Sequence, residues 1–415
     1  MTSPGRTVDV LVAGGGIIGM SVAFQVARRS NCSVMVVDKG LGPGEGSTGA
    51  SSAVCRFKYS HPEMVRLARD GIEAYRRWPE FLGTDDVRAE YQRLGVLWFG
   101  DGSDDWADAD SGRLAEEGIR TAVLSSADVR ERYPALNPCI VAPDLAEAAP
   151  HDCRDGGSHL LEVDGGYVDP VSALQDLIDA ARQNGVDVRF QSEVADVRLD
   201  GGRISAATLS DGETIECGAL VCATGPWCNS LLSRVGLADR WPLEPTRIQI
   251  VHIDRPDGVV GDIPVCGDAL GGIYFRTQNR GQQILVGSVL SEDEEERVDP
   301  DNYAKYVDDD FARVKLHALQ HRIPGLSYAA AVRGYSGLYT INRTDMHPIV
   351  GRTPVEGFYV ANGFSGHGFK LAPAVGSLLA QAITGESSTF DTSVSADFLA
   401  FDRSPIALAS KTVLA

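Results

Sequence analysis

Three glycines near the N-terminus have the spacing of a nucleotide-binding loop. Gly14, Gly16 and Gly19 follow the apolar run VDVLVA at 8–13, and Asp38 stands 19 residues beyond Gly19. Gly14 allows a tight turn, Gly16 lets the backbone approach a pyrophosphate, and Gly19 lets the next helix pack close to the strand. The helix N-terminus then faces the phosphates, and a carboxylate at 38 can bind a ribose hydroxyl. The pattern predicts a dinucleotide site rather than a purely structural glycine turn.

A second glycine-rich segment follows and carries two hydroxyl side chains. It reads GLGPGEGSTGASSAVCR over residues 40–56, and Ser47 and Thr48 can bind a phosphate or a ribose. A pure nicotinamide enzyme would usually run directly into another β–α unit at this point. The long loop instead favours a larger cofactor that lies across the domain.

A third glycine-rich stretch stands late in the chain, where ANGFSGHGFKLAPAVG spans residues 361–376. It contains His367 and Lys370 and leads into an apolar run that predicts a helix over about 372–384. A helix N-terminus carries unpaired N–H donors and partial positive charge. A polar turn at such a place can hold a ligand that is, or becomes, negatively charged.

Several start and stop patterns identify the elements that would position these loops. The run MSVAFQVARR after the first glycines has helical spacing. Asp169 can cap a helix that has Pro170 at its first position, and Asn184–Gly185 end it. Ser60 and Glu63 have the spacing of a capping box before another helix.

Strands alternate with these helices, which predicts an α/β fold. The run ALVCATGPW at 219–227 reads as a buried strand that ends at Thr224 and Gly225, where the backbone can contact a cofactor. Other segments are assigned from their patterns as strands at 94–100, 186–190 and 241–290 and a helix at roughly 301–320.

Composition excludes several classes of function. The chain has 415 residues, a net charge of −19 and a pI of about 4.8, which disfavours nucleic acid and anionic membranes as partners. No apolar run approaches the ~20 residues of a membrane span, and we expect no signal peptide. The eight cysteines include no C-x-x-C pair, so we expect a reduced, cytoplasmic protein without a zinc site.

Taken together, the motifs resemble one family. The chain is similar to FAD-dependent amine oxidoreductases of the D-amino acid oxidase superfamily, in the branch of monomeric sarcosine oxidase and glycine oxidase. The similarity extends over nearly the whole chain in the same order. It is carried by VAGGGIIG, GSTGASSAVCR, GGYVDP, ATGPW, GLYTINRTDMHPIVG and GFSGHGFKLAPAVG.

The resemblance implies two domains. One is a Rossmann-type FAD-binding domain assembled from separate segments, and the other is a substrate domain whose mixed or antiparallel sheet covers the flavin. We assign residues 1–90, 155–230 and 333–400 to the first, and 91–154 and 231–332 to the second.

The resemblance also implies site residues. Lys370 and Arg56 fall where the family binds a substrate carboxylate, and Tyr274 and Tyr339 fall at pocket-lining tyrosines. A buried carboxylate needs cationic partners, which favours this role over two surface cations. His367 would contact the cofactor or satisfy a local backbone group. The residues assigned to FAD are Gly14, Gly16, Ile17, Ile18, Gly19, Asp38, Lys39, Ser47, Thr48, Val194, Ala223, Thr224, Gly225, Trp227, Gly363, Gly366, His367, Gly368, Phe369 and Lys370.

Three positions depart from the family pattern. Gly337 stands where sarcosine oxidase has a cysteine bonded to FAD, so we expect noncovalent FAD. Leu285 stands where sarcosine oxidase has a lysine that helps oxygen react, which argues against fast reaction with oxygen. The electron acceptor is expected to be either oxygen or an unidentified acceptor, such as a quinone or a protein. Val289 replaces a histidine, which implies a substrate of different size or shape from sarcosine.

We therefore expect oxidation of a C–N bond in a carboxylated amine: an N-methyl, cyclic or simple amino acid. Hydride transfer to flavin N5 would give an imine that water hydrolyses. The main alternative on the same fold is oxidation of a 2-hydroxy acid or a polyol phosphate. A flavin-binding protein without enzymatic activity and a nicotinamide dehydrogenase agree less well with the motifs.

Overall fold

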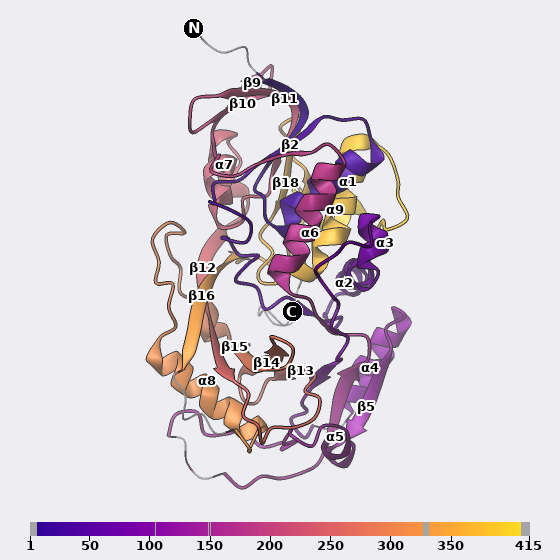
Figure 1. Ribbon diagram of the computed structural model, residues 1–415, viewed down its shortest axis with the longest axis vertical. Coiled ribbons are helices and arrows are strands. Elements are labelled where there is room, and N and C mark those ends of the chain that lie inside the picture. The colour runs from indigo at the N-terminus through magenta and orange to yellow at the C-terminus, as the bar shows by residue number, and fades with distance from the viewer. Residues whose placement is uncertain (1–5, 104, 148, 150, 327–331, 408–415) are drawn as a thin grey trace.

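Two large sheets form the frame of the molecule, one towards each end (Figure 1). The computed structural model describes residues 6–103, 105–147, 149, 151–326 and 332–407. Helices pack beside the first sheet, and the second sheet is mainly antiparallel. The predicted α/β class with a second, mixed sheet is confirmed.

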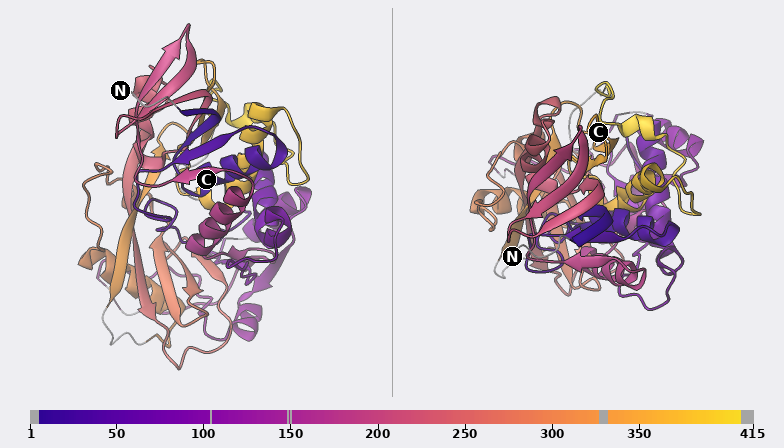
Figure 2. Two further views of the ribbon diagram at one scale, coloured as in Figure 1. Left: turned by 45° about the horizontal axis from the view of Figure 1, so that its top comes forward. Right: turned by 90° about the horizontal axis from the view of Figure 1, so that it is seen from above.

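The first sheet contains the N-terminal strand. Its members are β1 (Arg6–Ala13), β2 (Val34–Val37), β8 (Asp187–Arg189), β9 (Val194–Asp200), β10 (Arg203–Leu209), β11 (Thr214–Cys222), β17 (Ile349–Arg352) and β18 (Phe358–Asn362). The order is β17-β18-β11-β1-β2-β8, with β10 and β9 added beyond β11. The β9–β10 hairpin stands out at one end of the molecule (Figure 2, left). Strands β2, β1, β11 and β18 are parallel, so their carboxyl ends share one edge, where such sheets bind ligands.

Both faces of this sheet are covered, which explains its continuous apolar runs. The covering helices are α1 (Ile17–Arg29), α2 (Pro62–Arg76), α6 (Pro170–Gln183), α7 (Cys228–Arg234) and α9 (Gly368–Thr384). Val10 and Val12 of β1 belong to the core that includes α1 and α9, whereas Leu11 and Ala13 belong to the core on the side of α7.

The second sheet has the order β16-β12-β15-β14-β13-β4-β6-β5. Its strands, in chain order, are β4 (Val96–Trp98), β5 (Thr121–Ser125), β6 (Ser158–Glu162), β12 (Leu243–Asp254), β13 (Val265–Asp268), β14 (Ile273–Gln278), β15 (Gln283–Ser288) and β16 (Arg333–Asn342). Helix α8 (Asp309–Arg322) covers one face, where its Leu316 and Leu319 share a core with Phe275 and Ile284. The opposite face of β14 therefore points away from this core.

Shorter elements complete the chain. They are the helices α3 (Trp78–Leu82), α4 (Trp106–Glu116) and α5 (Ser126–Arg132), the paired strands β3 (Val54–Cys55) and β7 (Gly166–Tyr167), and 3₁₀ turns at Gly225–Trp227, Ala238–Arg240, Ser291–Glu294 and Ala396–Leu399. No described helix is long and apolar enough to cross a bilayer.

Local predictions had mixed outcomes. The Asp169 cap is confirmed, since its side chain accepts from the Ser172 amide at 2.8 Å. The Ser60–Glu63 capping box is wrong, because α2 begins after His61 without a side-chain cap. The predicted helix at 301–320 begins only at Asp309, and the last helix begins four residues before 372, at Gly368.

Sheet membership crosses the predicted domain segments. Residues 158–162 and 333–342, assigned to the cofactor domain, form β6 and β16 of the second sheet. The division into two domains stays a prediction.

Candidate functional site

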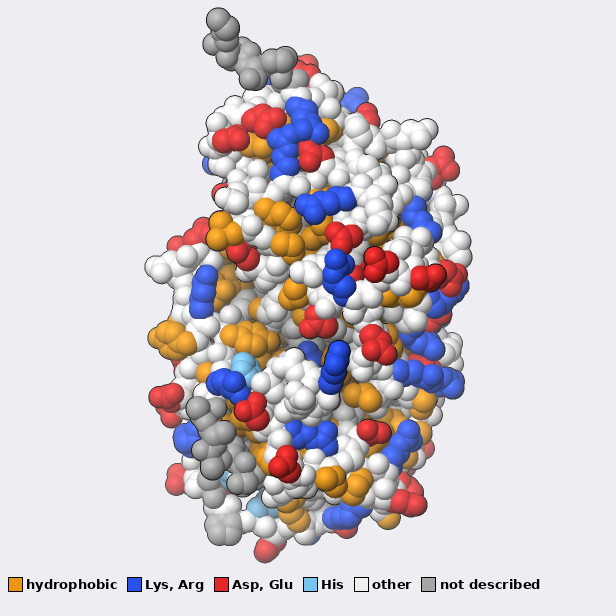
Figure 3. Space-filling view, in the orientation of Figure 1, with side chains coloured by type: hydrophobic (Ala, Val, Ile, Leu, Met, Phe, Trp, Pro, Cys, Tyr) orange, Lys and Arg blue, Asp and Glu red, His pale blue; other side chains and the backbone are white. Residues whose placement is uncertain are grey.

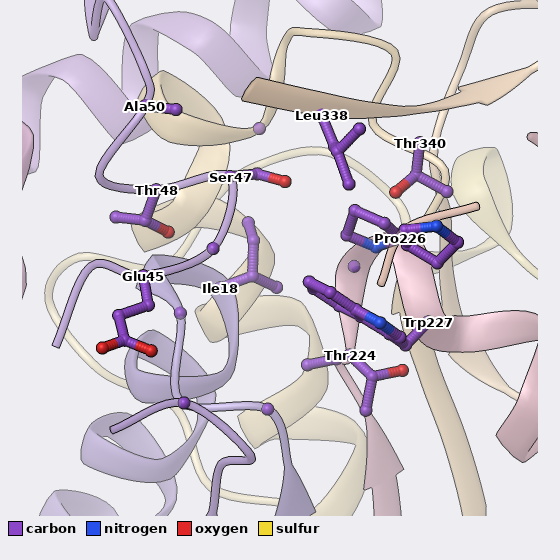
Figure 4. A pocket seen from close by; sticks show the side chains of 18 of the residues that line it. Ile18, Glu45, Ser47, Thr48, Ala50, Thr224, Pro226, Trp227, Leu338 and Thr340 are labelled. Atoms are coloured by element: carbon purple, nitrogen blue, oxygen red, sulfur yellow. The ribbon is translucent and has the colours of Figure 1, made fainter. Parts of the chain in front are cut away.

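A cavity of about 390 Å³ lies where the carboxyl ends of the first sheet meet β12, β14 and β16 of the second. This is within the size range of small-molecule and cofactor sites. Its lining includes residues from 13 to 369, so distant segments of the chain converge on it. In Figure 4, Ser47, Thr48 and Ile18 lie on one side of the cavity, and Trp227 and Leu338 lie on the other.

The N-terminal glycines make the close contacts that the motif predicts. Gly14 has φ +105°, and a Cβ there would lie 2.3 Å from the Ala223 carbonyl oxygen. A Cβ at Gly19 would lie 1.9 Å from the carbonyl oxygen of Gly14. A side chain at Gly14 would push this turn away from the end of β11, and one at Gly19 would push α1 away from the turn after β1, so both positions require glycine.

The start of α1 faces the cavity with a cap from another segment. Gly16 precedes the helix without a side-chain cap of its own, and Thr48 Oγ1 accepts from the Ile17 amide at 3.0 Å. Ser47 Oγ is buried and has no hydrogen-bond partner among the described residues. A buried hydroxyl rarely lacks a partner. A phosphate at this helix N-terminus would supply one, so these residues fit the pyrophosphate of a dinucleotide.

Asp38 and Lys39 lie at the next part of the cavity. The Asp38 carboxylate accepts from the amides of Gly15 at 2.6 Å and Gly40 at 2.8 Å, which fixes it at the end of β2. Lys39 Nζ lies 2.6 Å from Asp301 Oδ1 and 4.7 Å from the Trp227 ring centroid. Trp227 Nε1 also donates to Asp301 at 2.9 Å, so this carboxylate orients both predicted residues.

The turn before α9 forms the far end of the cavity. Gly366, Gly368 and Phe369 line it, and the helix begins at Gly368. Gly366 has φ +85°, and a Cβ there would lie 2.6 Å from the Tyr339 ring. The backbone therefore lies directly against a pocket tyrosine, and the helix N-terminus is available to a ligand.

Not every predicted residue reaches the cavity. Eighteen of the predicted residues line it: Gly14, Gly16, Ile17, Ile18, Asp38, Lys39, Ser47, Thr48, Val194, Ala223, Thr224, Gly225, Trp227, Tyr274, Tyr339, Gly366, Gly368 and Phe369. Gly19 and Gly363 shape the backbone behind it, and a Cβ at Gly363 would lie 2.8 Å from the Leu243 side chain. His367 is buried with its ring 5.2 Å from that of Tyr59, in an edge-on contact.

The two predicted cations meet in the interior. Arg56 and Lys370 are 6% and 4% exposed, which contradicts a surface location. The Arg56 guanidinium lies 4.2 Å and Lys370 Nζ 5.7 Å from the ring centroid of Tyr59. Arg56 also donates to the Lys58 carbonyl. Residues 314 positions apart in the chain thus place two positive groups at one ring, next to the last cavity residue, Phe369.

Burial sets the electrostatics of this cation pair. Burial, and after it the charge of Arg56, lower the pKa of Lys370 to about 7, although Cys55 and Glu162 oppose the shift. Glu162 accepts from Trp98 Nε1 at 2.7 Å and from the Lys58 amide at 3.0 Å. Burial raises the pKa of this carboxyl, against those hydrogen bonds. An added carboxylate would stabilise both cations in their charged forms.

The tyrosines remain neutral at the cavity. Burial raises the pKa of Tyr274 and, well above its usual value, that of Tyr339, so both keep an O–H donor. Arg276 lies on the same face of β14 as Tyr274 and is 3% exposed. Its Nε donates to the Ser52 carbonyl at 2.7 Å, and its guanidinium lies 4.2 Å from the Tyr167 ring centroid.

Four residues of the site escaped the sequence reasoning: Tyr59, Glu162, Arg276 and Asp301. Only Arg276 had a local sign in the sequence, because residues two apart on a strand share a face. Tyr59 and Glu162 become part of the site because β6 contacts the segment after β3. No spacing in the sequence predicts this tertiary contact.

Comparisons with known proteins agree with this geometry. A mouse protein, FAD-dependent oxidoreductase domain-containing protein 1, is 29% identical over 430 residues, covering 94% of this chain and 84% of its own. Human peroxisomal sarcosine oxidase is 25% identical over 382 residues, covering 89% and 90%. The crystal structure of L-proline dehydrogenase from P. horikoshii has a TM-score of 0.80 and 22% identity, covering 96% of this chain and 98% of that one.

The family model described as DAO, FAD dependent oxidoreductase, matches residues 9–382. This match confirms the resemblance and the cofactor that the sequence predicted. The chain therefore belongs to the DAO family of FAD dependent oxidoreductases.

Proposed function

We propose that this enzyme oxidises the CH–NH bond of a small amine that carries a carboxylate. The observation that carries the proposal is the pair of buried cations, Arg56 and Lys370, at the Tyr59 ring beside the cavity. Glu162 offsets only part of the shift in the pKa of Lys370, so this pair of buried positive groups favours the binding of an added anion. The sarcosine and amino acid oxidoreductases among the relatives support an amino acid as that ligand.

The residues around the cavity have separate roles in this proposal. Arg56 and Lys370 bind the substrate carboxylate, the first through a planar fork and the second as a point charge. Tyr274 and Tyr339 enclose the substrate and exclude water from the reacting carbon. The N-terminus of α9 provides fixed N–H groups where negative charge develops. FAD, when bound, supplies the two-electron acceptor.

We further propose that FAD is held without a covalent bond. No cysteine and no histidine is among the described residues that line the cavity, and Gly337 occupies the position of the family's cysteine. A Cβ at Gly337 would lie 2.5 Å from the Ala50 side chain, so even a small side chain would crowd this place. Acid precipitation of the protein is expected to release all of the FAD into the supernatant.

The electron acceptor is proposed to be other than oxygen. Leu285 is fully buried and lies opposite Arg276 in the β14–β15 register, on the face of β14 that carries Tyr274. A leucine offers no positive charge to a developing superoxide or peroxide anion, and the neighbouring Arg276 guanidinium is held by the Ser52 carbonyl and the Tyr167 ring. Stopped-flow oxidation of reduced enzyme by air is expected to be slower than oxidation by a quinone analogue.

The direct test is anaerobic flavin bleaching by a panel of N-methyl, cyclic and simple amino acids, with 2-hydroxy acids and polyol phosphates beside them. We expect bleaching only by carboxylated amines. Arg56→Ala and Lys370→Met should each lower kcat/KM by about 10- to 100-fold, the effect of one charge-assisted contact. Lys58→Met is a matched control, because Lys58 pairs with Asp110 at 3.1 Å. Bleaching by hydroxy acids alone would overturn the proposal.

A further inference from the structure

Four metal-binding side chains gather at a place remote from the cavity. Cys139, His151, Cys153 and His321 each offer one ligand atom, and these atoms all lie within 4.8 Å of one another. Cys139 is buried, the two histidines are half-buried and Cys153 is exposed. None of the four lines the FAD cavity.

We propose that these residues form a tetrahedral Cys₂His₂ site for a zinc-class metal ion. Zinc bonds of about 2.3 Å to sulfur and about 2.0–2.1 Å to nitrogen place ligand atoms roughly 3.3–3.8 Å apart. The Sγ of Cys139 and Nε2 of His151 are 3.3 Å apart. The His151 and His321 rings meet edge to face, with centroids 4.4 Å apart, as two imidazoles on one ion can.

Three hydrogen bonds donated to the two sulfurs suit thiolates, whereas a long contact of 3.8 Å from Cys139 Sγ to the Val141 carbonyl would use the thiol proton. Cys139 Sγ accepts from the amides of Arg154 at 3.3 Å and Val141 at 3.4 Å. Cys153 Sγ accepts from Asn137 Nδ2 at 3.2 Å. A neutral thiol is a weak acceptor, whereas a metal-bound thiolate is stabilised by such outer donors. Metal binding by these two thiols would release two protons to solvent.

A second observation points to the same ligand. His321 Nε2 is buried and has no hydrogen-bond partner among the described residues. A metal bond through this atom would satisfy it. A disulfide between Cys139 and Cys153 would explain why the two sulfurs are close, but it would not explain why two histidines lie beside them.

The proposed site would fasten a long connection to a helix. The four ligands come from the segment between α5 and β6 and from the last turn of α8, both at the lower end of Figure 1. Arg322, next to His321, donates to the carbonyls of Asn137 at 3.1 Å and Cys139 at 2.6 Å. The ligands have the order Cys-x₁₁-His-x-Cys, with the fourth ligand, His321, far away in the chain. The absence of C-x-x-C pairs therefore did not exclude a zinc site of this kind.

The test is elemental analysis of the purified holoenzyme, made with zinc in the growth medium and kept reduced. We expect one zinc ion per chain, and after exchange for cobalt the ligand-field bands of a tetrahedral thiolate site. Cys153→Ser and His151→Asn should each lower bound zinc at least tenfold without loss of FAD. The matched controls are Cys32→Ser and His317→Asn, the latter four residues before His321 on α8, and both should keep the zinc.

Three results would overturn the proposal. They are wild-type enzyme that takes up no zinc or cobalt under reducing conditions, a Cys139–Cys153 disulfide found by mass spectrometry in reduced preparations, and variants at Cys153 and His151 that retain the metal. FAD content is measured in every sample, so failure of the metal site is distinguishable from loss of the flavoprotein fold.

Discussion

At the scale of single residues, Lys370 has the most unusual environment. Burial lowers its pKa to about 7, and Arg56 adds to the effect. The Tyr59 ring offsets part of this cost by a cation–π contact at 5.7 Å. The charged form of Lys370 is therefore poorly stabilised until an anion binds beside it. Functional sites often lower the stability of the fold in this way in order to bind a ligand.

The first prediction concerns the pH dependence of anion binding. Below pH 7 Lys370 is protonated and binds a carboxylate, and above pH 7 it loses its charge in the free enzyme. Binding of propionate, a carboxylate without an amine, should weaken about five- to tenfold between pH 6 and pH 9. Calorimetric titration measures this. In Lys370→Met the affinity should be low and flat with pH, and an unchanged slope would contradict the assignment.

The second prediction concerns stability without ligand. Between pH 7 and about 10.5 Lys370 binds more protons in the unfolded chain than in the folded protein. Its contribution to the free energy of unfolding therefore rises with pH in this window. Below pH 7 the lysine is charged in both states, and the full cost of burying that charge lowers the stability of the fold. Lys370→Met should therefore be more stable than the wild type by about 2–4 kcal/mol at pH 6.5, with a smaller difference at pH 9.5. Urea unfolding measures both. Lys58→Met should show neither effect.

At the scale of elements, α9 depends on a bond from α2. Pro373 lies inside α9 and has no N–H, so the carbonyl of Phe369, four residues earlier, lacks its helical partner. The Tyr75 hydroxyl donates to this carbonyl at 2.9 Å, and its ring stacks on Phe369 at 5.1 Å. A Cβ at Gly71 would lie 2.2 Å from the Lys370 carbonyl oxygen, so the close packing of α2 against α9 also fixes the position of the Lys370 backbone.

The third prediction follows from this bond. Tyr75→Phe keeps the stacked ring but leaves the Phe369 carbonyl buried without a partner, which should lower the free energy of unfolding by about 1–3 kcal/mol. It should also weaken propionate binding, because the first turn of α9 carries Lys370. Tyr91→Phe is the control: it loses a similar 2.7 Å bond to the Asp164 carbonyl, outside α9. Equal effects of both variants on propionate binding would argue against the role of Tyr75.

The starts of three helices, α1, α6 and α9, show which features the sequence predicts and which it does not. Local chemistry predicted the Asp169 cap and the close contact of Gly19 with Gly14, because neighbours in the chain decide them. The contact of Gly14 with Ala223 is tertiary, and only the motif as a whole predicted a tight turn there. The predicted start of α9 is four residues late. The Tyr75 hydroxyl, which satisfies the Phe369 carbonyl that Pro373 leaves without a helical partner, is 298 positions from that proline in the chain. The cap on α1 is likewise a tertiary contact, from Thr48.

At the scale of the whole molecule, strand pairing brings the site together. β1 pairs with β11, about 200 residues later in the chain, and β11 with β18. The sequence motifs predicted the convergence of these segments, but only through the resemblance to a family. On the face shown in Figure 3, acidic and basic side chains are interspersed, whereas Arg56 and Lys370 are buried. The cation pair is therefore a feature of the interior and not of the surface.

The last prediction tests whether FAD unites the two sheets. Ile17 and Thr48 line the cavity from the first sheet and its loops, and Ile250, Tyr274 and Tyr339 line it from the second, so FAD bound in this cavity would bridge both. A ligand that binds only the folded state stabilises it by about 2.7 kcal/mol at 100 times its dissociation constant. Adding FAD to apoprotein should shift thermal unfolding upward as one transition and slow hydrogen exchange in both β1 and β12. Slower exchange in β1 alone would mean that the second sheet folds independently of the cofactor, and the site would then be completed only when substrate binds.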